Sequence, residues 1–137
     1  MITGFCSETE EEHQDTLSLM DEVQYEFAYM FYYSERPGTL AEKKFKDDVP
    51  LEIKKRRLDE IIQKQRSHSD MLNRRDVGKT FKVLIEGTSK KSDQHFQGRN
   101  SANKVIVFPR ENTRIGEYVN VLVESSTGGT LIGKIVR

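Results

Sequence analysis

The side chains with the clearest chemical potential are basic and amide groups in the second half of the chain. They occur beside glycine, serine and asparagine, residues typical of turns and strand ends. Lysine and arginine at such positions bind phosphate oxygens, and amides bind the edges of nucleobases. The residues predicted to contact an oligonucleotide are Lys90, Lys91, Arg99, Asn103, Lys104, Arg110 and Arg114.

Two of these residues, Arg99 and Asn103, are the strongest candidates, because neighbouring glycine leaves the backbone open to a ligand. Aromatic rings that stack on bases are also available nearby, at His95, Phe96 and Phe108. Phe81 and Phe108 are better suited to core positions. The alternative interpretation of the whole set is a solvated basic surface on a β-domain.

Metal and nucleophile chemistry find little support. The soft ligands Cys6, His13, His68 and His95 share no recognised ligand spacing. His13 follows the apolar stripe of a predicted helix, which favours a packed histidine. Cys6 precedes an acidic helix, and nearby acids work against a reactive thiolate. The sequence therefore predicts neither a metal site nor a catalytic residue in this chain.

The 137 residues contain 22 basic and 22 acidic side chains, and the net charge of zero conceals an asymmetry. Residues 1–48 carry −8, residues 49–73 carry +2 and residues 74–137 carry +6. This distribution indicates two units with different partners, the basic one facing an anion. A single cysteine excludes an internal disulfide.

Membrane and export signals are not expected. No apolar run approaches the roughly 18 residues that a membrane-spanning helix needs. Glutamates follow the short apolar start, in contrast to a signal peptide. We therefore expect a cytoplasmic protein without a membrane partner.

The N-terminal third has a strand–helix–strand pattern. Met1–Phe5 is typical of a short buried strand, and Thr9 with Glu12 forms a capping box at the start of a helix over residues 10–24. The apolar and aromatic run Phe27–Tyr33 predicts a strand covered on both faces, as in parallel sheets. Two parallel strands cannot bury both faces alone. Residues 1–48 therefore resemble the terminal piece of a larger α/β domain.

The middle of the chain is expected to be helical. Thr39 caps a short helix over Leu40–Phe45, and Pro50 suits the first position of a long helix that ends near Arg74. The apolar stripe of this long helix is thin, and the basic run at residues 54–57 is expected to cover its other faces. Residues 49–73 are therefore predicted to form a linker helix packed on one side only.

From Val77 onwards the apolar period becomes two. Four β runs are predicted, at residues 81–85, 104–108, 118–123 and 130–136, separated by glycine, asparagine and serine clusters. A small antiparallel barrel of the OB-like kind over residues 74–137 would hide the strand edges. The predicted fold class is thus α+β in two parts joined by a helix.

Several motifs resemble the tRNA methylthiotransferase family. The segments Ile2–Thr9 and Phe31–Ala41 are similar to the C-terminal part of the radical-SAM half-barrel of those enzymes. The runs Glu86–Lys91, Gly98-Arg99 and Asn103–Phe108 resemble the TRAM domain that ends them. Arg36-Pro37 together with the basic runs points to the MiaB-type branch. The resemblance covers nearly the whole chain.

The resemblance implies methylthiolation of an isopentenylated adenosine beside the tRNA anticodon, with two [4Fe–4S] clusters and S-adenosylmethionine as cofactors. The cluster cysteines of the family lie upstream of the matching region. The chain is therefore expected to be a C-terminal fragment that is inactive alone and binds no cofactor. Its expected partners are the anticodon stem-loop of tRNA and the missing N-terminal and radical-SAM portions. In the alternative, the TRAM barrel is a structural lid on the catalytic half-barrel with little RNA contact.

The resemblance also assigns residues to a partial S-adenosylmethionine pocket. Ile2 and Gly4 match the strand that flanks the adenine, and Glu8 matches the acid that braces the following turn. Phe31, Tyr33 and Ser34 match the next strand, whose end lines the same pocket.

Overall fold

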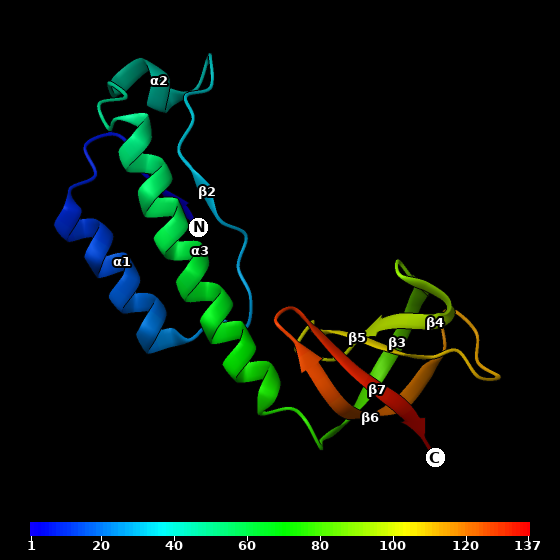
Figure 1. Cartoon of the computed structure of the whole chain (residues 1–137). Helices are drawn as coiled ribbons and strands as arrows, with labels where there is room; N and C mark the ends of the chain where they lie inside the picture. The colour runs from blue at the N-terminus through cyan, green and yellow to red at the C-terminus, as the bar shows by residue number, and fades with distance from the viewer. The chain divides into compact units, whose positions relative to one another are not determined.

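The computed structural model describes residues 1–137 and divides them into two compact units, Met1–His68 and Ser69–Arg137 (Figure 1). Helix α3, Leu51–Arg74, continues through the boundary between them. The division into residues 1–48, 49–73 and 74–137 stays a prediction. No helix is both long and apolar enough to cross a membrane.

Helix α1, Glu10–Val23, begins as its capping box predicts. The Glu12 amide donates to the Thr9 hydroxyl (3.2 Å), and the Thr9 amide donates to the Glu12 carboxylate (2.8 Å). The helix ends at Gln24, whose left-handed backbone lets its amide donate to the Met20 carbonyl. Local sequence therefore determines both ends of α1.

The two strands of the first unit are parallel, as predicted, but much shorter than expected. Strand β1 is Ile2–Thr3 and strand β2 is Phe31–Tyr32. The prediction of a strand over Phe27–Met30 is wrong, because β1 offers only two residues as hydrogen-bonding partners. The predicted burial on both faces is also absent within this unit, where the side chain of Tyr29 is 73 % exposed.

Two further helices complete the first unit. Helix α2, Leu40–Lys44, is capped by the Thr39 hydroxyl, which accepts from the Glu42 amide. Helix α3 begins at Leu51, and the Pro50 carbonyl accepts from the Lys54 amide. Pro50 therefore precedes the first helical residue instead of occupying that position. Helices α1 and α3 lie side by side (Figure 1).

The expectation that the basic run at residues 54–57 covers exposed faces of α3 is wrong for two of its residues. Lys54 is 3 % exposed and Arg57 is 4 % exposed. The Lys54 ammonium donates to Asp47 (2.5 Å) and to the Tyr33 carbonyl (3.2 Å). Arg57 pairs with the Glu8 carboxylate (2.8 Å). These cations are buried because each has an acidic partner from another segment of the unit.

The second unit is a closed five-stranded barrel with the strand order β3-β4-β5-β7-β6. Its strands are β3 (Thr80–Ser89), β4 (Ser92–Arg99), β5 (Val105–Pro109), β6 (Tyr118–Thr127) and β7 (Thr130–Val136). The four predicted strands are all present, but β4 was not predicted. Four neighbouring pairs are antiparallel and β5–β7 is parallel, which corrects the expectation of an entirely antiparallel barrel.

Alternate residues of every strand fill the barrel core. The fully buried members are Val83, Ile85, Phe96, Ile106, Phe108, Val121, Val123 and Leu131. The core position predicted for Phe108 is confirmed, and Phe96, expected to be available for stacking, belongs to the core as well. Two glycines allow close strand contact: a Cβ at Gly98 or Gly133 would lie 2.2 Å from the carbonyl oxygen of Leu84 or Leu122.

Candidate nucleic-acid interface

The outer face of strands β4, β5 and β7 carries a mixed polar and apolar surface. Phe96, Ile106 and Phe108 enter the core, so the residues that alternate with them, His95, Gln97, Val105 and Val107, face outwards. The register places Gln97 opposite Val107, and Val107 opposite Ile132. One row of side chains therefore runs across three strands.

This row lies in a groove of about 400 Å³, here called the barrel groove. Its lining from the strands includes Ser89, Ser92, His95, Gln97, Val105, Val107 and Ile132. The β3–β4 turn contributes Lys90 and Lys91, and the β6–β7 hairpin contributes Thr127 and Thr130. The barrel groove thus joins cationic, amide, imidazole and aliphatic groups on one face.

Lys90 and Lys91 occupy the turn between β3 and β4, as the sequence predicts. Both are exposed, both line the barrel groove, and neither forms an ion pair within the chain. The two ammonium groups are therefore open to an external anion.

Arg99 and Asn103 contact each other beside the barrel groove. The Arg99 guanidinium donates to the Asn103 side-chain oxygen (3.0 Å) and carbonyl (3.1 Å), and also to Glu86 (3.2 Å). Arg99 lies opposite Val105, a lining residue of the groove. The residues singled out from the sequence are thus together, but Glu86 already neutralises part of the Arg99 charge.

Lys104 has a different position from the surface site expected of it. Its side chain is 8 % exposed, and its ammonium pairs with Asp76 at 2.5 Å. Burial acts to raise the pKa of Asp76, but hydrogen bonds from Lys104 and Lys79 outweigh it and hold that pKa below its usual range. Lys104 therefore binds a carboxylate inside the unit, and no longer suits a phosphate.

The last two predicted contacts, Arg110 and Arg114, are exposed on the barrel. The Arg110 guanidinium lies 5.0 Å from the centre of the Phe96 ring and covers it. Arg114 lies in the β5–β6 connection, where its amide donates to Glu117 (3.0 Å). Neither residue lines the barrel groove.

The residues assigned by resemblance to a cofactor pocket separate into two groups. Ile2, Phe31, Tyr33 and Ser34 line one largely apolar cavity of about 650 Å³ in the first unit. Gly4 and Glu8 lie outside it: the Gly4 amide donates to the Glu8 carboxylate (2.9 Å), which also accepts from Thr3 (3.2 Å). Glu8 therefore braces the loop after β1. Cys6 is the only thiol and is buried.

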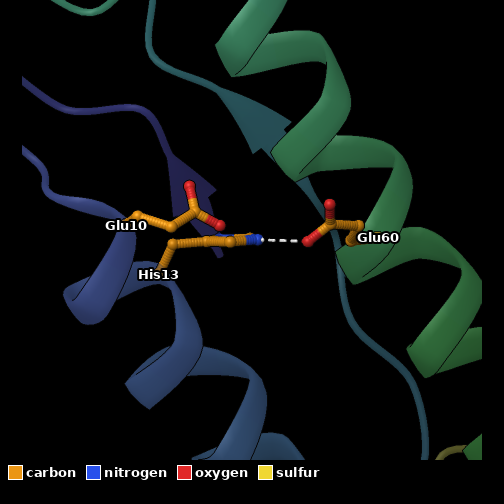
Figure 2. A group of neighbouring side chains, drawn as sticks. All are labelled: Glu10, His13 and Glu60. Atoms are coloured by element: carbon orange, nitrogen blue, oxygen red, sulfur yellow. Dashed lines mark hydrogen bonds and ion pairs between the residues drawn. The ribbon is translucent and has the colours of Figure 1, made fainter.

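A group of two glutamates and a histidine holds α1 against α3 (Figure 2). His13 of α1 points at Glu60 of α3, with 2.8 Å between the Nε2 and the carboxylate oxygen. His13 is fully buried, which confirms the prediction of a packed histidine. Arg56 pairs with both Glu10 and Glu60 at 2.6 Å. Its guanidinium supplies the positive charge that a metal ion would bring.

The sequence interpretation missed Gln97, Val105, Val107 and Ile132 as lining residues of the barrel groove. The signal available for them was the alternation of apolar core positions with other residues in each strand, together with recognition of β4. Without β4 the outward row loses the strand at one end, and nothing in the sequence links Gln97 to the outward residues of β5 and β7.

Comparisons with known proteins find similarity over both parts of the chain. Residues 74–136 match the family model described as "TRAM domain". The chain is 65 % identical over 135 residues to "tRNA-2-methylthio-N(6)-dimethylallyladenosine synthase" of Amoebophilus asiaticus, covering 98 % of the chain and 28 % of that relative. The protein of the same name from Christiangramia forsetii is 56 % identical over 134 residues, with the same two coverages.

The chain therefore spans about 28 % of the length of the curated relatives it matches. One solved structure, of a conserved protein from Methanococcus maripaludis, matches with a TM-score of 0.37 and 24 % identity. The matched region covers 44 % of this chain and 80 % of the Methanococcus maripaludis chain. That similarity is too low to support an argument.

Proposed function

Given that this chain carries a TRAM domain and is a relative of one segment of the tRNA-2-methylthio-N(6)-dimethylallyladenosine synthases, we propose that its barrel binds tRNA. The proposal rests on Lys90 and Lys91, two cations that form no ion pair within the chain. They lie at the rim of the barrel groove, on a unit with excess positive charge. Such groups attract the phosphates of a polyanion.

The proposed contacts extend beyond the groove. Lys90 and Lys91 bind phosphates at the rim of the barrel groove. Arg99 and Asn103 bind RNA beside Val105, the lining residue opposite Arg99. Arg110 and Arg114 add charge from the exposed surface. Lys104 is left out of the proposed RNA contacts, because its ammonium is buried against Asp76.

For the whole enzyme we propose the reaction that the relatives' name describes, methylthiolation of dimethylallylated adenosine in tRNA. Residues 1–48 would be the last strand–helix–strand piece of a radical-SAM half-barrel. The parallel β1–β2 pair and the exposed aromatic side chains of Phe31 and Tyr29 support this, since further strands would cover them.

The cofactor chemistry belongs to the remainder of such an enzyme. Ile2, Phe31, Tyr33 and Ser34 would form one wall of an S-adenosylmethionine pocket, and Glu8 would hold the adjoining loop. S-adenosylmethionine supplies the radical and the methyl group in this chemistry. The buried single thiol of Cys6 offers no cluster ligand set, and we propose that the 137-residue chain alone is inactive.

The test is RNA binding by the 137-residue chain. An anticodon stem-loop is titrated in 50 mM and 200 mM salt, with fluorescence anisotropy as the readout. Neutralising about three to five phosphates gives a slope of about −2 to −4, and hence a loss of about 16- to 250-fold between the two conditions. Arg99→Ala should weaken binding at both. Equal affinity at both salt concentrations would remove the electrostatic basis of the proposal.

The same titration separates the alternative in which the barrel is a structural lid. A lid predicts that variants of Lys90, Lys91 and Arg99 bind the stem-loop as wild type does, and that they lower the stability of the full-length enzyme instead. Normal RNA binding by all three variants would therefore favour the lid over the RNA-binding proposal.

A further inference from the structure

We propose that the barrel groove holds an unpaired nucleobase from a single-stranded RNA segment, with its base on the aliphatic floor and its phosphates at the lysine rim. This inference rests on the proposed function, because it names the form of RNA that the site accepts. The argument uses three features of the groove: its floor, its polar wall and its rim.

The floor of the groove is aliphatic although it faces outwards. Val105, Val107 and Ile132 contribute it, and Ile132 is 40 % exposed. These side chains have nothing to offer a phosphate, but they pack well against the flat face of a base. A double helix keeps its base faces stacked inside, so only an unpaired base can present one.

The polar wall is formed by His95 and Gln97 of β4, next to the floor. The Ser92 hydroxyl accepts from the Gln94 amide (3.3 Å) and lies 3.0 Å from His95 Nδ1. Its own hydrogen is free to point at Nδ1 in the tautomer that carries its proton on Nε2. Neither His95 Nε2 nor the side-chain amide of Gln97 has a hydrogen-bond partner in the chain. These groups match the acceptors and donors of a base edge.

The rim supplies the phosphate contacts on both sides of the floor. Lys90 and Lys91 lie at one part of the rim, and Arg99 adjoins Val105 at another. The volume of about 400 Å³ is near the small end of the range for ligand pockets, about 300–1,000 Å³. The groove therefore suits one nucleotide-sized group on a continuing backbone.

The experiment compares three RNAs with equal numbers of phosphates: a stem-loop, a fully paired duplex, and the stem-loop with abasic sites throughout its loop. Binding to the 137-residue chain is measured by anisotropy at one salt concentration. We expect the stem-loop to bind about 5- to 10-fold more tightly than either of the others, because it alone presents an unpaired base to the aliphatic floor.

Variants then locate the base. His95→Ala, Gln97→Ala and Ile132→Thr should each lower affinity for the stem-loop by about 5- to 10-fold and leave affinity for the duplex unchanged. Gln94→Ala is the matched control, because Gln94 is an exposed residue of β4 that does not line the groove. Amide NMR spectra check that each variant keeps the barrel fold.

Three results would overturn the inference, and each has a different meaning. If all three RNAs bind equally and with the same salt dependence, the chain binds RNA but the groove holds no unpaired base. If no RNA binds at any salt concentration, the proposed function fails and the inference fails with it. If all three groove variants bind the stem-loop with wild-type affinity, the groove is not the site of the base, although the chain still binds RNA.

Discussion

The ammonium of Lys104 lies 2.5 Å from the Asp76 carboxylate, and both side chains are almost completely buried. Asp76 follows α3 by two residues, and Lys104 immediately precedes β5. Asp76 also accepts from Lys79 at 2.9 Å. This contact joins the segment before β3 to the segment before β5, and it explains why one lysine of the predicted RNA-binding set is not on the surface.

Removing Lys104 should destabilise the barrel. Lys104→Ala leaves the Asp76 carboxylate buried with one exposed partner, and a broken buried pair costs about 3 kcal/mol. Lys79→Ala is the control, because Lys79 is exposed and its pair contributes less than about 1 kcal/mol. Urea unfolding, followed through amide signals of the barrel strands, measures both. Equal destabilisation by the two variants would contradict this role of Lys104.

Gly98 should tolerate no side chain. A Cβ there would lie 2.2 Å from the Leu84 carbonyl oxygen, so Gly98→Ala should lower the free energy of unfolding of the barrel by about 3 kcal/mol. Gly87→Ala is matched, since nothing lies within 4 Å of that position and its cost should stay within about 1 kcal/mol. The same unfolding measurement applies, and a stable Gly98→Ala barrel would show that the strands separate easily.

The lysine pair at the groove rim should account for part of the salt dependence of RNA binding. Replacing both Lys90 and Lys91 by alanine should reduce the slope of log affinity against log salt by about 1.4, since each single-strand phosphate contact contributes about 0.7. Lys134→Ala is the control, because Lys134 is paired with Glu124 at 2.7 Å. If Lys134→Ala reduces the slope as much as each of the Lys90 and Lys91 replacements does, RNA binds to the net charge of the barrel and not to the groove rim.

Glu10 should titrate far below an ordinary glutamate. The hydrogen bond from Arg56 is the main cause that lowers its pKa from 4.5 to about 2. A lowered pKa contributes stability that is complete above pH 4.5 and is lost as the pH falls towards 2. Carboxyl NMR of Glu10 should show this pKa, and Arg56→Gln should raise it towards 4.5. Arg66 is an exposed residue of α3, and Arg66→Gln should leave the pKa of Glu10 unchanged. An equal rise of that pKa in both variants would contradict a specific Arg56–Glu10 pair.

Features encoded locally could be predicted from the sequence. The capping residues Thr9 and Thr39 place the starts of α1 and α2, and the alternation of apolar residues identifies four barrel strands. Strand β4 was missed because Phe96 is its only large apolar residue, and its hydrogen bonds come from β3 and β5. Tertiary pairing, rather than propensity, makes it a strand.

In the candidate site, too, features set by local sequence could be predicted and features set by distant partners could not. Lys90, Lys91, Arg99 and Asn103 lie near one face, as their loop and strand-end positions predict. The burial of Lys54, Arg57 and Lys104 could not be predicted, because their carboxylate partners are 7 to 49 residues away in the sequence. Charge in the sequence therefore gives no information about exposure until the partners are known.

The parallel pairing of β5 with β7 has a consequence for how the barrel is made during translation. Strands β3 and β5 emerge from the ribosome first, but their remaining edges pair only with β6 and β7. Closure must therefore wait until the residues of β7 that pair with β5, Leu131 and Ile132, have left the exit tunnel. A premature stop codon within β7 would leave two strands with open edges, which makes the truncated product a substrate for aggregation or proteolysis.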